Sequence, residues 1–501
     1  MYVSLGDYSA PPQHCFLPPG VGGTPPQFSI RMEMTTDERT RRETETIAAV
    51  ATPPGRGGIG IVRLSGPDAW TITGRLVRPK RPLEAGRAVL ADVQDPNDPD
   101  AAPIDEAVVT AFAGPHSYTG EDVVEIAAHG SPVVLETLLR AALTAGVRLA
   151  APGEFTQRAF LNGRIDLTQA EAVQDLIAAQ TLEQARMAAQ QLGGALSRRV
   201  APVKEQLVTL IALLEAGMDF AAGELDDVDV VSPEHIQTVL AGVCESLQQL
   251  ARSHAQGHRL REGASLALVG RPNVGKSSLF NRLLERERAI VTPLPGTTRD
   301  TVEEAVAVAG IPLRLIDTAG LRLAGESPTD EAEALGIARS REALADADLV
   351  VLVIDASFDL SSEETDLLES LAGRPHLVVR NKADLLPPCG QTLFSDHTRV
   401  IFTSALTGEG LDDLRAGIRR LLHAEGGAAT GGVLNSLRQQ EAVKSALASL
   451  DAGAAANENR VPHEFLLADL HTALRALDSL TGQTTSDDIL HRIFSTFCIG
   501  K

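Results

Sequence analysis

The sequence predicts a multidomain protein that combines an α+β domain, a helical domain and an α/β domain. Three observations predict this fold class. Short β-branched runs bounded by Gly, Pro and Asp occur before residue 130, and long segments poor in β-branched residues follow residue 166. Between residues 262 and 425, strand-like and helix-like segments alternate. A chain of 501 residues has room for about two to four domains, each with its own core.

Composition limits the partners and the cellular setting. No uninterrupted apolar run approaches the ~20 residues that span a bilayer, so we expect no membrane partner. The four cysteines have no metal-ligand spacing, and a reducing, cytoplasmic setting is the default expectation. With a formal net charge of −21, the chain would have to meet any nucleic acid on a local basic surface.

The first segment differs from the rest of the chain. Residues 1–44 are rich in Pro and Gly and show no periodicity, so we expect disorder there. The segment lacks the charged start and apolar core of a signal peptide. Met32 or Met34 is an alternative first residue.

The α+β domain is predicted over residues 45–165. A helix should begin after Ser131, which precedes a proline in the first turn. The predicted strands are 58–64, 106–112 and 122–128.

A helical domain is predicted over two segments, 166–261 and 426–501. Thr168 and Glu171 have capping-box spacing at the start of the first long helix. A later helix, capped by Ser232, is predicted to continue to about residue 260. Helices on both sides of a middle segment indicate one discontinuous helical domain with another domain inserted in it.

The inserted domain covers residues 262–425. Its predicted strands are "SLALVG", "LRLIDTAG", "LVVLVIDA", "HLVVRNKAD" and "VIFTSA", with helical patterns between them. Alternation of this kind predicts a mostly parallel sheet covered by helices on both faces.

A glycine-rich loop follows the first of these strands. The segment "GRPNVGKSS", Gly270 to Ser278, opens a helical pattern, which is the context that a phosphate-binding loop requires. Its backbone N–H groups and the helix N-terminus favour phosphate, with Lys276 on the β and γ phosphates and Ser277 on Mg²⁺. A glycine-rich loop without a nucleotide is the alternative reading.

Further motifs follow at the ends of later strands. They are "GTTRD", with Thr298 as a second Mg²⁺ ligand; "DTAG", Asp317 to Gly320; "NKAD", Asn381 to Asp384; and "TSAL", Thr403 to Leu406. The Asp384 carboxylate can accept two hydrogen bonds that guanine offers and adenine does not. Four motifs in this order predict a Ras-like P-loop GTPase domain.

The residue that orients the attacking water is less evident. Ras-like enzymes place a glutamine after Asp-x-x-Gly, and this chain has Leu321 there. The acidic residues that follow, Glu333 among them, either position water or are solvated carboxylates at a helix N-terminus. Asn273 either coordinates a monovalent cation beside the phosphates or only stiffens the loop.

From about Glu45 to Lys501 the chain resembles the MnmE (TrmE) family of tRNA-modification GTPases. Beyond the GTPase motifs, the resemblance is carried by "TIAAVATPPGRGGIGIVRLSGP", "SYTGEDVVEIAAHG", "PGEFTQRAFLNGRIDLTQAEAV" and the terminal "DDILHRIFSTFCIGK". It implies a folate-binding N-terminal domain that dimerises, a two-segment helical domain and an inserted GTPase domain.

The resemblance also implies an activity and partners. A homodimer works with an FAD-containing MnmG-like partner, as a heterotetramer, on C5 of the wobble uridine of certain tRNAs. The group added is carboxymethylaminomethyl or aminomethyl, and 5-formyl- or 5,10-methylene-tetrahydrofolate supplies the carbon. Potassium and pairing of two GTPase domains stimulate GTP hydrolysis.

Site residues follow from the resemblance position by position. The residues expected to bind GTP are Asn273, Val274, Gly275, Lys276, Ser277, Ser278, Thr292, Pro293, Leu294, Pro295, Gly296, Thr297, Thr298, Asp317, Thr318, Ala319, Gly320, Asn381, Lys382, Ala383, Asp384, Ser404, Ala405 and Leu406. Those expected to bind K⁺ are Asn273, Thr292, Leu294 and Thr297, and those expected to bind Mg²⁺ are Ser277 and Thr298. Glu333 matches the residue that positions water.

The resemblance places folate on Arg63, Glu125, Arg164 and Lys501. Cys498 is a candidate for chemistry near the one-carbon unit, and a small buried hydrophobe beside two phenylalanines is the alternative. Two other functions stay open: a ribosome-assembly GTPase, and a dimeric GTP-gated scaffold without a folate site. The first would typically carry an RNA-binding KH domain or tandem GTPase domains, and the sequence shows neither a Gly-x-x-Gly loop in a basic helix–turn context nor a second phosphate loop.

Overall fold

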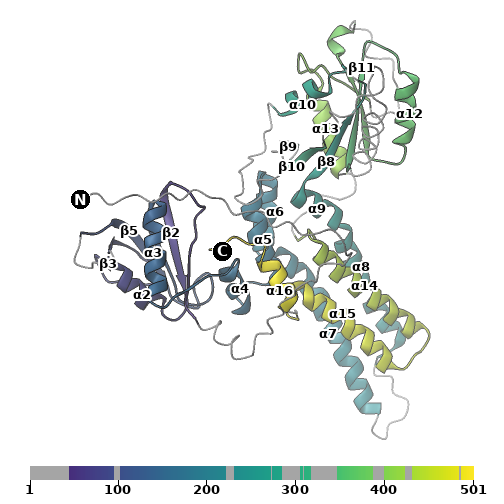
Figure 1. Cartoon of the computed structure of the whole chain (residues 1–501). Helices are drawn as coiled ribbons and strands as arrows, with labels where there is room; N and C mark the ends of the chain where they lie inside the picture. The colour runs from purple at the N-terminus through teal and green to yellow at the C-terminus, as the bar shows by residue number, and fades with distance from the viewer. Residues whose placement is uncertain are drawn as a thin grey trace, which may run out of the picture. The chain divides into compact units, whose positions relative to one another are not determined.

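The computed structural model describes residues 45–94, 102–221, 231–271, 273–284, 305–308, 310–316, 347–386, 400–423, 432–484 and 487–500. The chain divides into two units, Met1–Glu45 and Thr46–Lys501, and all elements below belong to the second. Figure 1 traces them along the chain. The disorder expected over residues 1–44 lies outside the described residues. None of the described helices is long and apolar enough to cross a membrane.

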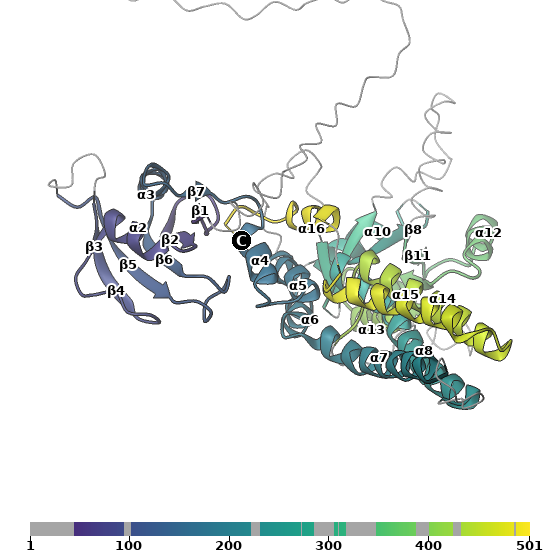
Figure 2. The same cartoon turned by 90° about the horizontal axis from the view of Figure 1, so that it is seen from below.

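The N-terminal sheet has seven strands in the order β3-β4-β5-β6-β2-β1-β7. The strands are β1 (Ile47–Val50), β2 (Gly57–Ser65), β3 (Val77–Pro79), β4 (Ala88–Val93), β5 (Asp105–Phe112), β6 (Val123–Gly130) and β7 (Arg148–Leu149). Alternate residues of β2, β5 and β6 pack with α2 (Ala69–Leu76) and α3 (Pro132–Thr144) into one buried core (Figures 1 and 2). The three predicted strands are confirmed to within two residues.

The first helix cap was predicted at the wrong residue. α5 (Leu167–Ala178) begins after Asp166, whose Oδ1 accepts the Gln169 N–H at 2.9 Å, while Gln169 Oε1 accepts the Asp166 N–H at 3.0 Å. Thr168 lies inside the first turn and donates to Asp166 at 2.7 Å. Two overlapping cap patterns occur in "DLTQAE", and aspartate is at least as good a cap as threonine.

The long helical pattern that follows is divided into several helices. They are α5, α6 (Leu182–Leu192), α7 (Ala195–Ala221), α8 (Pro233–Arg252) and α9 (His254–Glu262). α4 (Glu154–Leu161) precedes them and lies within the residues predicted as the α+β domain. The Ser232 cap is confirmed, because its hydroxyl accepts the His235 N–H at 3.2 Å. The prediction of one helix to about residue 260 is wrong, since α8 ends at Arg252 and α9 begins at His254, with Ser253 as the cap residue between them.

Two segments that are far apart in sequence share one helical core. α7 and α8 pack with α14 (Leu437–Glu458) and α15 (His463–Thr481), and buried leucines from all four helices form a single cluster. Figures 1 and 2 both show these helices side by side. α16 (Asp487–Phe494) follows, and we call residues 495–500 after it the C-terminal tail.

The second sheet has six strands in the order β13-β12-β11-β8-β10-β9, and all neighbours are parallel except β9 and β10. Its elements are β8 (Ala264–Val269), α10 (Lys276–Leu284), β9 (Ala305–Val308), β10 (Ile311–Ile316), β11 (Leu349–Asp355), α12 (Ser362–Ser370), β12 (His376–Asn381), η1 (Ala383–Leu385), β13 (Val400–Phe402) and α13 (Leu411–His423). α10 and α13 pack on one face and α12 on the other, so the predicted parallel-type sheet covered by helices is confirmed.

Candidate functional site: a nucleotide site and a docked C-terminal tail

The phosphate loop connects β8 to α10 and makes two close backbone approaches. Gly270 has φ 146°, and a Cβ there would lie 2.1 Å from the carbonyl oxygen of Val353 in β11. Gly275 has φ 93°, and a Cβ there would lie 2.3 Å from Asn381 Nδ2. Glycine is therefore required at both positions, because the loop passes directly against the strand ends that surround it.

Lys276 folds back over this loop. Its Nζ donates to the carbonyl oxygens of Gly270 at 2.7 Å and Arg271 at 2.9 Å. Burial lowers the pKa of Lys276. Phosphate oxygens in the loop would supply the negative charge that this partly desolvated ammonium lacks. Ser277 and Ser278 are exposed in the first turn of α10, where a hydroxyl can reach a phosphate-bound Mg²⁺.

Asn273 has a backbone reason to be asparagine. It has φ 63°, in the left-handed region that asparagine tolerates better than most residues, and it is exposed. Within the described residues its side chain makes no hydrogen bond. Both expectations for Asn273, cation ligand and loop former, fit this geometry.

Asn381 joins the phosphate loop to the segment that would read the base. Its side chain is 1% exposed; Nδ2 donates to the Val274 carbonyl at 2.9 Å, and Oδ1 accepts the Ala405 N–H at 3.1 Å. Because a buried amide with both ends bonded holds a fixed orientation, it locks the two loops together.

Polar contacts also orient the other residues expected to bind the guanine base. Lys382 has φ 66° and its Nζ pairs with Asp355 at 2.7 Å. The Ser404 hydroxyl donates to Asp384 Oδ1 at 2.5 Å, which fixes the carboxylate while Asp384 itself stays exposed. Leu406, two residues after Ser404, is 78% exposed and offers an apolar surface for a base.

The described residues thus bring three predicted segments together: Asn273–Ser278, Asn381–Asp384 and Ser404–Leu406. The other predicted residues lie outside the described residues: Thr292, Pro293, Leu294, Pro295, Gly296, Thr297, Thr298, Asp317, Thr318, Ala319, Gly320, Glu333 and Lys501.

A second cluster lies on the N-terminal sheet. Arg63 of β2 is opposite Glu125 of β6 in register, and its Nε and Nη2 lie 2.9 and 2.7 Å from Glu125 Oε1. The guanidinium lies 5.5 Å from the ring centroid of Tyr118 and 5.6 Å from that of Phe155. Its Nη1 donates to the carbonyl oxygen of Gly500 at 3.4 Å. Arg63 therefore contacts the sheet, two aromatic rings and the C-terminal tail at once.

The tail is also held by the backbone that leads into α4. The Gly153 N–H donates to the Cys498 carbonyl at 3.4 Å, and Pro152 forms an antiparallel bridge with Ile499. Phe494 and Phe497 are buried, whereas Cys498 is exposed. The alternative of Cys498 as a buried hydrophobe is therefore wrong, and its thiol is accessible.

Arg164 lies against the same region. Its Nε donates to the Ser117 carbonyl at 3.1 Å, next to the tyrosine that covers Arg63. Among the described residues its two terminal nitrogens have no partner, and the side chain is exposed. Two of the four predicted folate residues, Arg63 and Arg164, thus contact residues 117–118, and a third, Glu125, is bonded to Arg63.

An ionic network supports this cluster from α4. Glu154 pairs with Arg148 and, at 3.1 Å, with Arg158, which reaches Glu121 at 3.0 Å. Burial acts to raise the pKa of Glu154, but the Arg148 pair and the Ala151 N–H outweigh it, so the pKa lies below its usual value.

Tyr118 and Phe155 are site residues that sequence reasoning missed. Both are within the blocks that carry the family resemblance, but aromatic residues are usually core, and no pattern indicated a shared arginine.

The buried Asn381 of the Asn-Lys-x-Asp segment bonds the phosphate loop, and both lie on a mostly parallel sheet. This combination defines a P-loop GTPase. Comparisons with known proteins extend this class to the whole chain. The family model "MnmE helical domain" matches residues 167–498, and "GTP-binding protein TrmE N-terminus" matches residues 46–164. This chain belongs to the MnmE family.

Relatives cover nearly the full length. The tRNA modification GTPase MnmE of Koribacter versatilis is 54% identical over 91% of this chain and 99% of its own. That of Chloroflexus aurantiacus is 46% identical over 91% of this chain and 100% of its own. Among solved structures, the G domain of the T. maritima FeoB iron transporter is 31% identical, with a TM-score of 0.22, over 32% of this chain and 98% of that one.

Proposed function

We propose that this protein is the GTP-hydrolysing component of a complex that modifies C5 of the wobble uridine of certain tRNAs in the cytoplasm. The group added is carboxymethylaminomethyl or aminomethyl. The observation that carries the proposal is the 54% identity, over 99% of its length, to a relative named for tRNA modification. The assembled nucleotide site and the docked tail support it.

In the nucleotide site, Lys276 would neutralise the β and γ phosphates, and Asp384 would read guanine. Ser277 and Thr298 would hold Mg²⁺, which supplies positive charge to the reacting phosphates. Glu333 would position water. Ser277 lies in the first turn of α10, and its hydroxyl oxygen is a suitable ligand for Mg²⁺.

A potassium ion would take the place of an arginine finger. Asn273, Thr292, Leu294 and Thr297 would provide its oxygen ligands when two GTPase domains pair within the homodimer. The exposed side chain of Asn273, unbonded within the described residues, is available for this role.

A 5-formyl- or 5,10-methylene-tetrahydrofolate would supply the one-carbon unit. Arg164 fits a folate carboxylate, because only its Nε is used by the described residues. Glu125 and Arg63 would bind the ring system, with Lys501 on the pterin or glutamate. The exposed Cys498 thiol would lie beside the carbon carried by the folate.

Mass spectrometry of tRNA nucleosides tests the proposal most directly. Cells lacking this protein should lose the C5-substituted wobble uridine and accumulate its unsubstituted form. Wild-type protein should restore the modification, whereas Lys276→Ala should not. An unchanged nucleoside profile in the deleted strain would refute the proposed function.

The partners are tested separately with purified proteins. Light scattering should show a homodimer, and addition of an FAD-containing MnmG-like protein should produce a heterotetramer. Pairing of the GTPase domains should strengthen with GDP, aluminium fluoride and potassium. A chain that stayed monomeric under all these conditions would exclude the dimer mechanism.

A further inference from the structure

Helix α5 contacts the C-terminal tail through one side chain. Gln174 Nε2 donates to the Thr496 carbonyl at 3.4 Å, and Gln174 Oε1 lies 3.0 Å from the Thr496 hydroxyl, whose proton it shares with the Ile493 carbonyl at 2.7 Å. Thr496 is two residues before Cys498. The amide therefore holds both the side chain and the backbone of the tail just before its exposed thiol.

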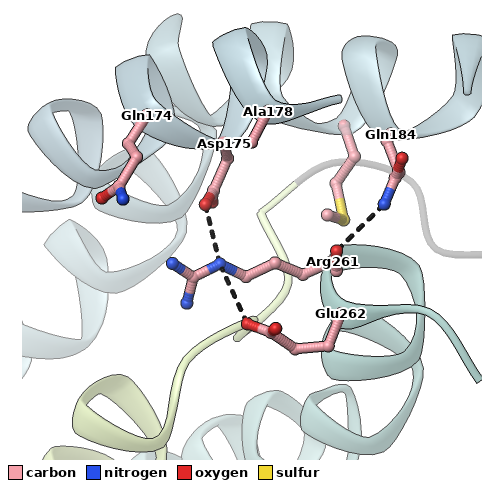
Figure 3. A pocket seen from close by; sticks show the side chains of 7 residues that line it. Gln174, Asp175, Ala178, Gln184, Arg261 and Glu262 are labelled. Carbon is pink, nitrogen blue, oxygen red and sulfur yellow. Dashed lines mark hydrogen bonds and ion pairs between the residues drawn. The ribbon is translucent and has the colours of Figure 1, made fainter. Parts of the chain in front are cut away.

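The next residue of α5, Asp175, contacts Arg261 of α9 and Asn435, which lies just before α14. Asp175 Oδ1 lies 2.7 Å from Arg261 Nε (Figure 3). Asp175 Oδ2 accepts a hydrogen bond from Asn435 Nδ2 at 2.9 Å. The Asp175 side chain is 7% exposed and that of Arg261 is 23% exposed. The Arg261 carbonyl also accepts Gln184 Nε2 of α6 at 2.9 Å, so its backbone is fixed as well.

Arg261 is placed where the chain leaves the helical domain for the nucleotide site. It lies in the last turn of α9, and three residues later Ala264 begins β8, the strand that leads to the phosphate loop. A shift of β8 along its axis would therefore also displace the end of α9, because the two are joined by a single residue. The connection is covalent and does not depend on how the two domains are oriented.

The ion pair favours its two charges unequally. Burial acts to lower the pKa of Arg261, but the charge and hydrogen bond of Asp175 outweigh it, so that pKa lies above its usual value. Burial raises the pKa of Asp175, and the pair with Arg261 offsets only part of that effect. Replacing buried ion pairs by apolar residues is often neutral or stabilising, whereas such pairs fix the register of packed elements. The pair is thus better suited to setting the position of α9 against α5 than to holding the fold together.

Space for movement exists beside the pair. A cavity of about 190 Å³ is lined by Gln174, Asp175, Ala178, Gln184, Met187, Arg261 and Glu262. Figure 3 shows the Arg261 side chain extending across it toward Asp175. Packed interiors resist displacement, so a cavity at this contact allows α9 to shift without overpacking. One turn earlier, Glu171 is held by Arg438 at 2.7 and 3.0 Å and provides a fixed point for α5.

We propose that Gln174 and Asp175 are positioning residues that couple the nucleotide site to the C-terminal tail, by linking the end of α9 to Thr496 through α5. A change in the phosphate loop moves β8 and Arg261, the ion pair moves the end of α5, and Gln174 moves the tail. The purpose of moving the tail rests on the proposed function, but the coupling itself can be measured without tRNA or folate.

The experiment uses the Cys498 thiol as a reporter in the full chain. The parent protein carries serine in place of Cys15, Cys244 and Cys389, and its rate of alkylation by a maleimide is measured with GDP and with GDP, aluminium fluoride and potassium. We expect the two rates to differ at least threefold in the parent. Gln174→Ala should make them equal while leaving GTP affinity and turnover unchanged.

Matched variants separate coupling from a general loss of structure. Thr496→Ser keeps the hydroxyl and should retain the state dependence, whereas Thr496→Val should lose it. Gln190→Ala removes an exposed glutamine of α6 that makes no side-chain hydrogen bond to the described residues, and it should behave as the parent. Asp175→Asn should reduce the difference by uncoupling α9.

Two results would overturn the proposal. One is a parent whose Cys498 reacts equally fast in both states. The other is a state dependence that survives both Gln174→Ala and Thr496→Val. Neither result bears on the proposed function, because the assay contains no tRNA. Conversely, if the proposed function in tRNA modification were refuted, a measured coupling would still stand.

Discussion

The nucleotide site and the tail site are assembled from the chain in different ways. Asn381 and Val274 are 107 residues apart. Asn381 ends β12 and Val274 lies in the loop after β8, and the carboxyl ends of parallel strands in one sheet meet at the same edge. Arg63 and the Gly500 carbonyl are 437 residues apart and obey no such rule. Short motifs at strand ends therefore predict the nucleotide site, because the sheet topology brings them together. No such motif predicts the tail site, because it forms only when the C-terminus docks.

The strongest test of the nucleotide site is removal of the Lys276 ammonium group, which lies over the phosphate loop. Lys276→Ala should weaken GTP binding by about 2–5 kcal/mol, because it truncates a charged partner of the phosphates in a partly buried loop. Titration with a fluorescent GDP measures the loss.

Lys204→Ala is the matched control for that titration. Lys204 of α7 pairs with Asp478 of α15 in the helical domain, away from the phosphate loop. Its removal should leave nucleotide affinity unchanged. Equal loss of affinity in both variants would mean that Lys276 acts only through stability.

Much of the nucleotide site could therefore be predicted from sequence, and less of the tail site. The strand-end motifs predicted the segments around Asn381 and Gly275 because local backbone geometry demands those residues. The helix cap at Asp166 was misplaced because two cap patterns overlap and only packing decides between them. Tyr118 and Phe155 were missed because their contact with Arg63 depends on tertiary structure alone.

The ionic network of the tail site gives the next largest expected effect. Glu154→Gln should lower the free energy of unfolding at pH 7 by about 1.5–3 kcal/mol, since it removes the charge from hydrogen bonds to buried or half-buried guanidinium groups. The pKa of Glu154 is lower in the folded protein than in the unfolded chain. Its contribution is thus complete above the unfolded value of about 4.3 and is lost as the pH falls through the folded value.

Urea denaturation at a series of pH values measures this contribution. The difference between wild type and Glu154→Gln should shrink below about pH 4.3. Glu136→Gln removes an exposed partner of Arg140 and should change stability by no more than about 0.5 kcal/mol at any pH. A Glu154 effect that did not depend on pH would point to lost packing instead of lost charge.

Substitution of Asn273 distinguishes its two expected roles, potassium ligand and loop former. Asn273→Gly keeps access to φ 63° but removes the side-chain carbonyl. If Asn273 is a potassium ligand, the variant should bind GTP normally and lose a potassium stimulation of about tenfold, equivalent to ~1.4 kcal/mol of the activation barrier. Turnover in potassium and in sodium at equal ionic strength provides the comparison.

Asn273→Ala completes that comparison, because alanine lacks the carbonyl and also disfavours the left-handed backbone. It should lose stimulation and also weaken GTP binding. Retained stimulation in Asn273→Gly would assign the asparagine to loop geometry alone.

The smallest expected effect concerns the docking of the tail. Arg63→Lys keeps the charge but loses the planar fork that bonds Glu125, contacts two rings and reaches Gly500. A hydrogen bond such as that from Arg63 to the Gly500 carbonyl contributes about 0.5–1.5 kcal/mol, so the tail should detach several-fold more often without it. Faster alkylation of Cys498 would report this release, with the other three cysteines replaced by serine.

Arg87→Lys is the matched control for tail docking, because Arg87 is 74% exposed and pairs only with Glu84 among the described residues. It should leave alkylation of Cys498 unchanged. If Arg63→Lys behaved in the same way, the hydrogen bond to Gly500 would not hold the tail. The backbone bridge between Pro152 and Ile499 would then be sufficient for docking, and Arg63 would be available for a ligand.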